Sequence, residues 1–80
     1  MFQTDDKKYS IFLIKKEDYY IPQVIKAIIT YFPLTEIQAE QLYLISFMKG
    51  KVKLASFDDY ETLNSVAIEF NKMGIETEII

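Results

Sequence analysis

The 80-residue sequence contains no cysteine, no histidine, no arginine and no tryptophan. Without cysteine there is neither a disulfide framework nor a thiolate nucleophile. Without histidine the chain lacks the usual general base and the commonest metal ligand. Without arginine it lacks the side chain that captures phosphate or carboxylate bidentately and reads guanine. These absences argue against an enzyme, a metal site and a nucleic-acid-binding protein.

The sequence also has little that would take the chain to a polyanion or a membrane. Its formal net charge is −3, which repels nucleic acid unless lysines cluster strongly. No run approaches the roughly 20 apolar residues of a membrane span. The beginning of the chain lacks the charged-then-apolar order of a signal peptide. We therefore expect a cytoplasmic protein whose partner is neither a nucleic acid nor a membrane.

Length and apolar content predict one domain with its own core. A chain of 80 residues suffices for one domain and not for two, and half of its residues are apolar. Such a core needs no metal, disulfide or cofactor. We expect a short flexible N-terminal lead over residues 1–8, a single domain over residues 9–80, and a monomer.

Two prolines and two glycines mark the ends of the predicted elements. Pro22 suits the first turn of a helix, and Pro33 disfavours helical geometry at the residue before it. Gly50 and Gly74 can each close a helix. With so few glycines there is no phosphate-binding loop.

Apolar patterning predicts six elements. They are a strand over 9–15, a helix over 22–31, a helix between Thr35 and Gly50, a strand over 51–57, a helix between Asp58 and Gly74, and a strand over 75–80. The first strand is apolar on both faces, so we expect it to be central. The predicted fold class is α+β, a two-layer β-α-α-β-α-β sandwich with three helices on one face of a three-stranded sheet. The other face, with Lys51, Lys53, Glu76 and Glu78, is expected to be wet.

The second and third helices carry start signals and apolar seams. Thr35 with Gln38 three residues later is a capping-box pattern. Asp58 with Glu61 predicts the start of the third helix by the same logic. The seam predicted for the second helix consists of Ile37, Leu42, Ile45 and Met48. The third helix is expected to face the core with Leu63, Val66, Ala67, Phe70 and Met73.

The stretch YSIFLIKKEDYYIPQVIKAI, residues 9–28, resembles the ClpS adaptor family. In that family a strand leads through an Asn-Asp-Asp-Tyr/Phe-Thr-Pro-Met turn into a helix. Asp18, Tyr19 and Pro22 match this turn, with one extra residue before the proline. LYLISFMKGKVKLASF, residues 42–57, resembles the ClpS passage from the second helix through a glycine into a strand. The resemblance covers residues 9–80 and implies a ClpS-like fold.

The C-terminal domain of the bacterial ribosomal stalk protein shares that fold and is also similar to this chain. The similarity lies in VIKAI, in NKMGIETEI and in the spacing of Leu34, Ala39 and Leu42. These are largely core and cap positions. In stalk domains a lysine-bearing helix surface docks translation factors, and Lys26 lies in the matching VIKAI segment.

The ClpS resemblance implies an adaptor that binds proteins with a bulky apolar first residue and presents them to a Clp-type ATP-dependent protease. In that family an Asn and an Asp of the turn, with a His of the second helix, hold the α-ammonium, and a Met gates the pocket. Here Lys16 stands at the Asn position, Phe47 at the His position and Gln23 at the Met position, so the pocket is degenerate. Glu17 and Asp18 can supply negative charge. The candidate peptide-binding residues are Lys16, Glu17, Asp18, Tyr19, Gln23, Tyr43 and Phe47.

Other interpretations of the same residues stay open. Lys15 to Asp18 can be a solvated turn, with Phe47 a packing residue. The alternative function is a stalk-domain-like interaction module without N-terminal-residue recognition, which docks a partner through the first two helices, Lys26 and Lys49. Either way we expect a non-enzymatic protein-binding module without a cofactor. The partner is then a protein or peptide. The first hypothesis is that the partners are a Clp-type ATPase and its substrate.

Overall fold

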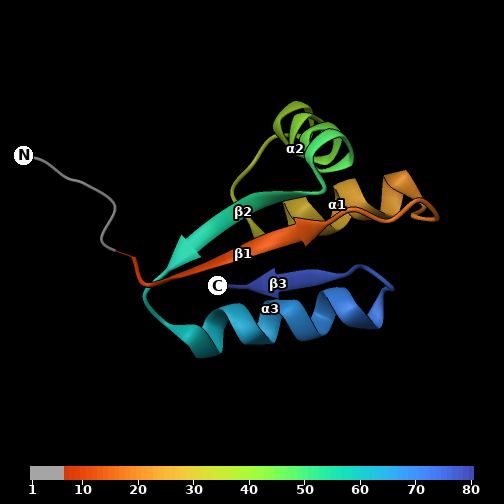
Figure 1. The fold of residues 1–80 in the computed structure, drawn as a ribbon. Coiled ribbons are helices and arrows are strands. Elements are labelled where there is room, and N and C mark those ends of the chain that lie inside the picture. The colour runs from red at the N-terminus through yellow and green to blue at the C-terminus, as the bar shows by residue number, and fades with distance from the viewer. Residues whose placement is uncertain (1–6) are drawn as a thin grey trace, which may run out of the picture.

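The computed structural model describes residues 7–80, which form three strands and three helices (Figure 1). The elements are β1 (Tyr9–Ile14), α1 (Ile21–Tyr31), α2 (Glu36–Lys49), β2 (Lys51–Phe57), α3 (Tyr60–Lys72) and β3 (Thr77–Ile79). This confirms the predicted α+β architecture and element order. The first six residues of the predicted N-terminal lead lie outside the described part of the chain. Within residues 7–80, no helix combines the length and the apolar character that crossing a bilayer requires.

β1 is the central strand, as its apolar residues on both faces predict. The sheet order is β2-β1-β3, and β1 is antiparallel to both neighbours. Ile11 and Leu13 point to the helices and are fully buried. Phe12 points to the opposite face, because successive side chains of a strand alternate. There the Lys51 ammonium lies 5.1 Å from the Phe12 ring centre and 3.2 Å from the Glu78 carboxylate.

A bulge in β2 changes which of its residues face the core. Ile11 pairs with Ala55 and Phe12 with Lys53, so Leu54 has no partner in β1. The extra residue shifts the alternation of β2 by one position. Ser56 therefore lies on the outer face, where its hydroxyl is 2.8 Å from that of Ser10. Without the bulge Ser56 would face the apolar core.

The buried face of α2 differs from the predicted seam. Ile37 and Met48 are 67% and 76% exposed, so their assignment to the core is wrong. The residues that α2 buries are Ala39, Tyr43 and Ser46. α2 is apolar around most of its circumference, so periodicity alone did not identify the inward face. The side chains that face inward include two small ones, which let the helix approach its neighbours closely.

The helix caps were predicted with one error. Thr35 and Gln38 form the expected reciprocal capping box at the start of α2. Asp58 does not cap α3, and the prediction that it does is wrong by one residue. The Asp59 carboxylate accepts hydrogen bonds from the Glu61 N–H at 3.1 Å and the Thr62 hydroxyl at 2.6 Å. These two bonds lower the pKa of the Asp59 carboxyl below its ordinary value.

The cap of α3 can be tested with a matched pair of variants. Asp59→Ala removes both hydrogen bonds and should lower the urea midpoint of unfolding near neutral pH, whereas Asp58→Ala should leave it unchanged. The lowered pKa means that the contribution of Asp59 is present above the unfolded-state pKa and is lost as the pH falls through the folded-state pKa. The difference between Asp59→Ala and the wild type should therefore shrink below pH 3.8. Equal midpoints for the two variants near neutral pH would contradict this assignment.

Candidate functional site

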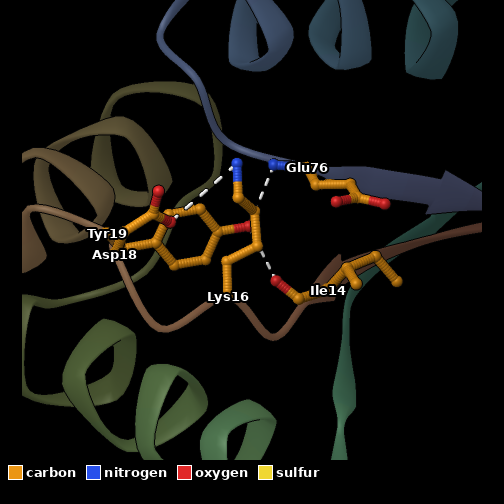
Figure 2. A network of polar contacts seen from close by, with 5 residues as sticks. All are labelled: Ile14, Lys16, Asp18, Tyr19 and Glu76. Carbon is orange, nitrogen blue, oxygen red and sulfur yellow. Dashed lines mark hydrogen bonds and ion pairs between the residues drawn. The ribbon is translucent and has the colours of Figure 1, made fainter.

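The turn between β1 and α1 is built around the Tyr19 hydroxyl. This hydroxyl donates a hydrogen bond to the Ile14 carbonyl at 2.7 Å and accepts one from the Glu76 N–H at 2.9 Å. Figure 2 shows the tyrosine reaching between the end of β1 and the backbone that leads into β3. Tyr19 therefore joins segments that are 57 residues apart in the sequence. Its ring fills part of the crook in which a peptide pocket was predicted.

The ionisation of Tyr19 reflects this position. Burial raises the pKa of the Tyr19 phenol above its ordinary value of 10.0, and the nearby carboxylates of Glu76 and Asp18 raise it further. The hydrogen bond from the Glu76 N–H acts in the opposite direction. The phenol is thus held in its neutral form, in which it can both donate and accept.

The charged residues of the turn are partly paired with one another. The Lys16 ammonium lies 4.0 Å from the Asp18 carboxylate, whose side chain is 79% exposed. The same ammonium lies 5.7 Å from the centre of the Tyr19 ring. A positive group thus already lies beside the Asp18 carboxylate.

The predicted peptide-binding residues are divided between two sides of α1. Lys16, Asp18, Tyr19 and Gln23 line a polar hollow of about 260 Å³ together with residues that follow α3. Tyr43 lines a different groove, between α1 and α2. Neither of these two sites includes Glu17 or Phe47 in its lining.

Phe47 lies at the edge of α2 and is exposed. Its ring stacks on that of Tyr43, with 6.5 Å between the ring centres. The Lys15 ammonium lies 4.6 Å from the centre of the Phe47 ring. Phe47 thus contacts a cation and a neighbouring aromatic ring, and it does not line the polar hollow.

The groove between α1 and α2 has a volume of about 490 Å³ and a largely apolar lining. The residues that line it are Ile21, Pro22, Ile25, Lys26 and Ile29 from α1, and Glu36, Glu40, Tyr43 and Leu44 from α2. Leu44 is 57% exposed. This volume lies within the roughly 300–1,000 Å³ of typical ligand sites. The groove is therefore a surface on which a partner can bury apolar side chains.

An apolar stripe on α2 continues the groove outward. Ile37, Leu44 and Met48 are spaced by seven and four residues, so they share one face of the helix. All three are exposed. Leu44 belongs both to this stripe and to the groove wall. A contiguous exposed apolar surface is a candidate interaction site.

α1 has a second hollow on its other side. It has a volume of about 610 Å³ and is lined by Tyr20, Pro22, Gln23, Lys26, Ala27, Thr30, Tyr31 and Met73. Pro22 and Lys26 line both this hollow and the α1–α2 groove. Lys26 therefore lies on a ridge between two concave surfaces. Lys49, its companion in the docking hypothesis, is exposed in the last turn of α2 and lines neither.

Sequence reasoning identified Lys26 and Tyr43 but missed the rest of the groove. Glu36, Glu40 and Leu44 carry no motif that singles them out. The signal that points to Leu44 is the apolar content of α2 around most of its circumference, because only one side of a helix can face the core.

The described residues offer no metal centre, since residues 7–80 contain no group of three or more potential carboxylate ligands close enough to hold an ion. The chain matches no model of a known protein family and none of the curated proteins with which it was compared. The groove must therefore be interpreted from its own chemistry.

The structural role of Tyr19 can be measured by deleting its hydroxyl. Tyr19→Phe loses two hydrogen bonds, of which the one to the Ile14 carbonyl is partly buried, and should lower the free energy of unfolding by about 1–2 kcal/mol. Tyr20→Phe is the matched control, because the Tyr20 ring is 71% exposed. The control should change the stability by less than about 0.5 kcal/mol. Urea unfolding monitored by circular dichroism gives both values, and equal losses would contradict the assigned role.

The raised pKa of Tyr19 predicts a loss of stability in alkali. A folded-state pKa above the unfolded value means that the contribution is fully present below the unfolded-state pKa and disappears as the pH rises through the folded-state pKa. The wild type should therefore lose stability above pH 10.0 more steeply than Tyr19→Phe. Urea midpoints over an alkaline pH series test this. Parallel curves for the two proteins would contradict it.

Proposed function

We propose that this chain is a non-enzymatic protein-binding module of the cytoplasm that docks an apolar segment of a partner in the groove between α1 and α2. The observation that carries the proposal is the groove itself, whose apolar lining is flanked by Lys26 on one side and by Glu36 and Glu40 on the other. Apolar side chains supply the binding free energy, and the charges orient the partner. This docking mode corresponds to the module expected to bind through its first two helices.

The magnitude of apolar burial supports this mode of binding. Fully burying one leucine-sized side chain is worth roughly 1.5–3 kcal/mol. A partner over the groove and the adjacent stripe would cover Leu44 and Met48, which are both exposed. It would also contact Ile21 and Ile29 at the two ends of the α1 wall. Several such contacts outweigh the cost of association only if the partner presents a matching apolar face.

A narrower form of the proposal is a ClpS-like adaptor that presents a substrate to a Clp-type ATPase through its first residue. That form requires a site for an α-ammonium in the turn before α1. The hollow beside Asp18 and Gln23 is the place where such a group would bind. The Lys16 ammonium beside Asp18 and the N-terminal end of α1 both oppose a second positive charge there. Docking in the groove without recognition of a free N-terminus is therefore better supported than binding of an α-ammonium beside Asp18.

Selected peptides can test the groove directly. Peptides enriched from a random displayed library against the folded protein should bind it with an affinity that Leu44→Glu weakens by about tenfold or more, because this variant places a charge in the apolar wall. Lys26→Glu should also weaken binding, because it removes the Lys26 ammonium from the rim of the groove. Ile68→Glu on α3 is the control, since Ile68 is 47% exposed and lies outside the groove. The proposal fails if the selected peptides bind Leu44→Glu and Ile68→Glu equally well.

Recognition of a free N-terminus needs a separate test. Short peptides that begin with Leu, Phe, Tyr or Trp are titrated against the protein, each compared with its N-acetylated form. Docking in the groove predicts that acetylation changes the affinity by less than about twofold, because no ammonium is bound. Binding that disappears on acetylation, and that Asp18→Asn also removes, would instead establish the ClpS-like form.

A further inference from the structure

We infer that the occupant of the α1–α2 groove is an amphipathic helix of a partner protein whose flank facing α2 is basic. The inference rests on the proposed function and specifies the chemistry of the partner. It follows from the length of the groove, from the charges on its two rims and from the absence of ion-pair partners for those charges among residues 7–80.

The shape of the groove fits a helix. Its α1 wall runs from Ile21 to Ile29, which is a rise of about 12 Å, or slightly more than two helical turns. A helix laid along this wall presents three apolar positions with i, i+3 or i+4, and i+7 spacing. The stripe of Leu44 and Met48 then contacts the side of that helix that leans outward over α2.

The rim on α2 is acidic. Glu36 and Glu40 are one helical turn apart, both line the groove and both are exposed. Neither forms an ion pair with any residue of the described part of the chain. Two unpaired carboxylates beside an apolar surface favour lysine or arginine on the occupant.

Glu40 is the more informative of the two carboxylates. Glu36 occupies the first turn of α2, where any acidic residue favourably faces the positive end of the helix dipole. Glu40 lies beyond that first turn, so the dipole does not account for it. On the opposite rim Lys26 is the single charged residue that lines the groove, and it too forms no ion pair among the described residues. The occupant is therefore basic toward α2 and carries at most one acidic residue toward α1.

Two synthetic helices that differ only in flank charge test this inference. Both have about 14 residues, or four helical turns, with the same leucine spacing and with acetylated and amidated ends. One carries lysine and the other glutamate on the flank that faces α2. At low salt the lysine peptide should bind about tenfold tighter than the glutamate peptide. It gains two exposed charge pairs with Glu36 and Glu40, whereas the glutamate peptide is repelled by both. The preference should largely disappear at about 1 M salt, where the screening length is about 3 Å.

Glu40→Lys and Asp58→Lys provide the matched variants. Both reverse one exposed carboxylate, but Asp58 lies outside the groove. α2 should stay folded in Glu40→Lys, because Glu36 then has a lysine four residues after it, which stabilises a helix; circular dichroism checks this. Glu40→Lys should no longer bind the lysine peptide more tightly than the glutamate peptide. Asp58→Lys should keep this difference in affinity.

Several results would overturn the inference. Equal binding of the two peptides, a preference for glutamate, or the same preference in both variants would exclude a basic occupant while leaving groove docking intact. If neither peptide binds but the library-selected peptides still depend on Leu44, the occupant is of another kind. A concentration-dependent dimer that Leu44→Glu abolishes would identify a second copy of this chain as the occupant. If the selected peptides are also indifferent to Leu44, the proposed function itself fails.

Discussion

The hydrogen bonds of the Tyr19 hydroxyl are the constraint on which the surface of this domain depends. They tie the end of β1 to the backbone before β3 and so set where the chain turns into α1. The tyrosine ring then occupies the crook, and the exposed concave surfaces lie to either side of α1. Tyr19, one of the predicted peptide-binding residues, is therefore also the support that separates these surfaces.

The packing of α2 determines what the groove offers to a partner. Ala39 and Ser46 are small, and the Ser46 hydroxyl donates a hydrogen bond to the Tyr43 carbonyl at 2.7 Å. With these residues inward, larger apolar side chains such as Leu44 and Met48 are left outside. The same choice of face that completes the core therefore creates the exposed apolar surface. The carboxylates of Glu36 and Glu40 beside it form no ion pair within the part of the chain that the structure describes.

Most of the fold follows from local signals in the sequence. The apolar run of β1, the capping box at Thr35 and Gly50, whose φ of 95° favours glycine, each act through neighbouring residues alone. The inward face of α2 and the division of the predicted site depend on tertiary packing instead. Local pattern cannot show that Tyr19 reaches a backbone amide 57 residues away, so the sequence predicts a ligand contact for this side chain and does not indicate its structural role.

The bulge of β2 has a consequence for how the sheet meets other molecules. β2 is an edge strand of the sheet that residues 7–80 form, and one side of its backbone pairs with no other strand of that sheet. Its irregular spacing at Leu54, with Lys51 and Lys53 on the same strand, makes that edge a poor template for another chain. Lateral growth of the sheet through the β2 edge is thereby disfavoured, even though the molecule displays apolar side chains on its helical side.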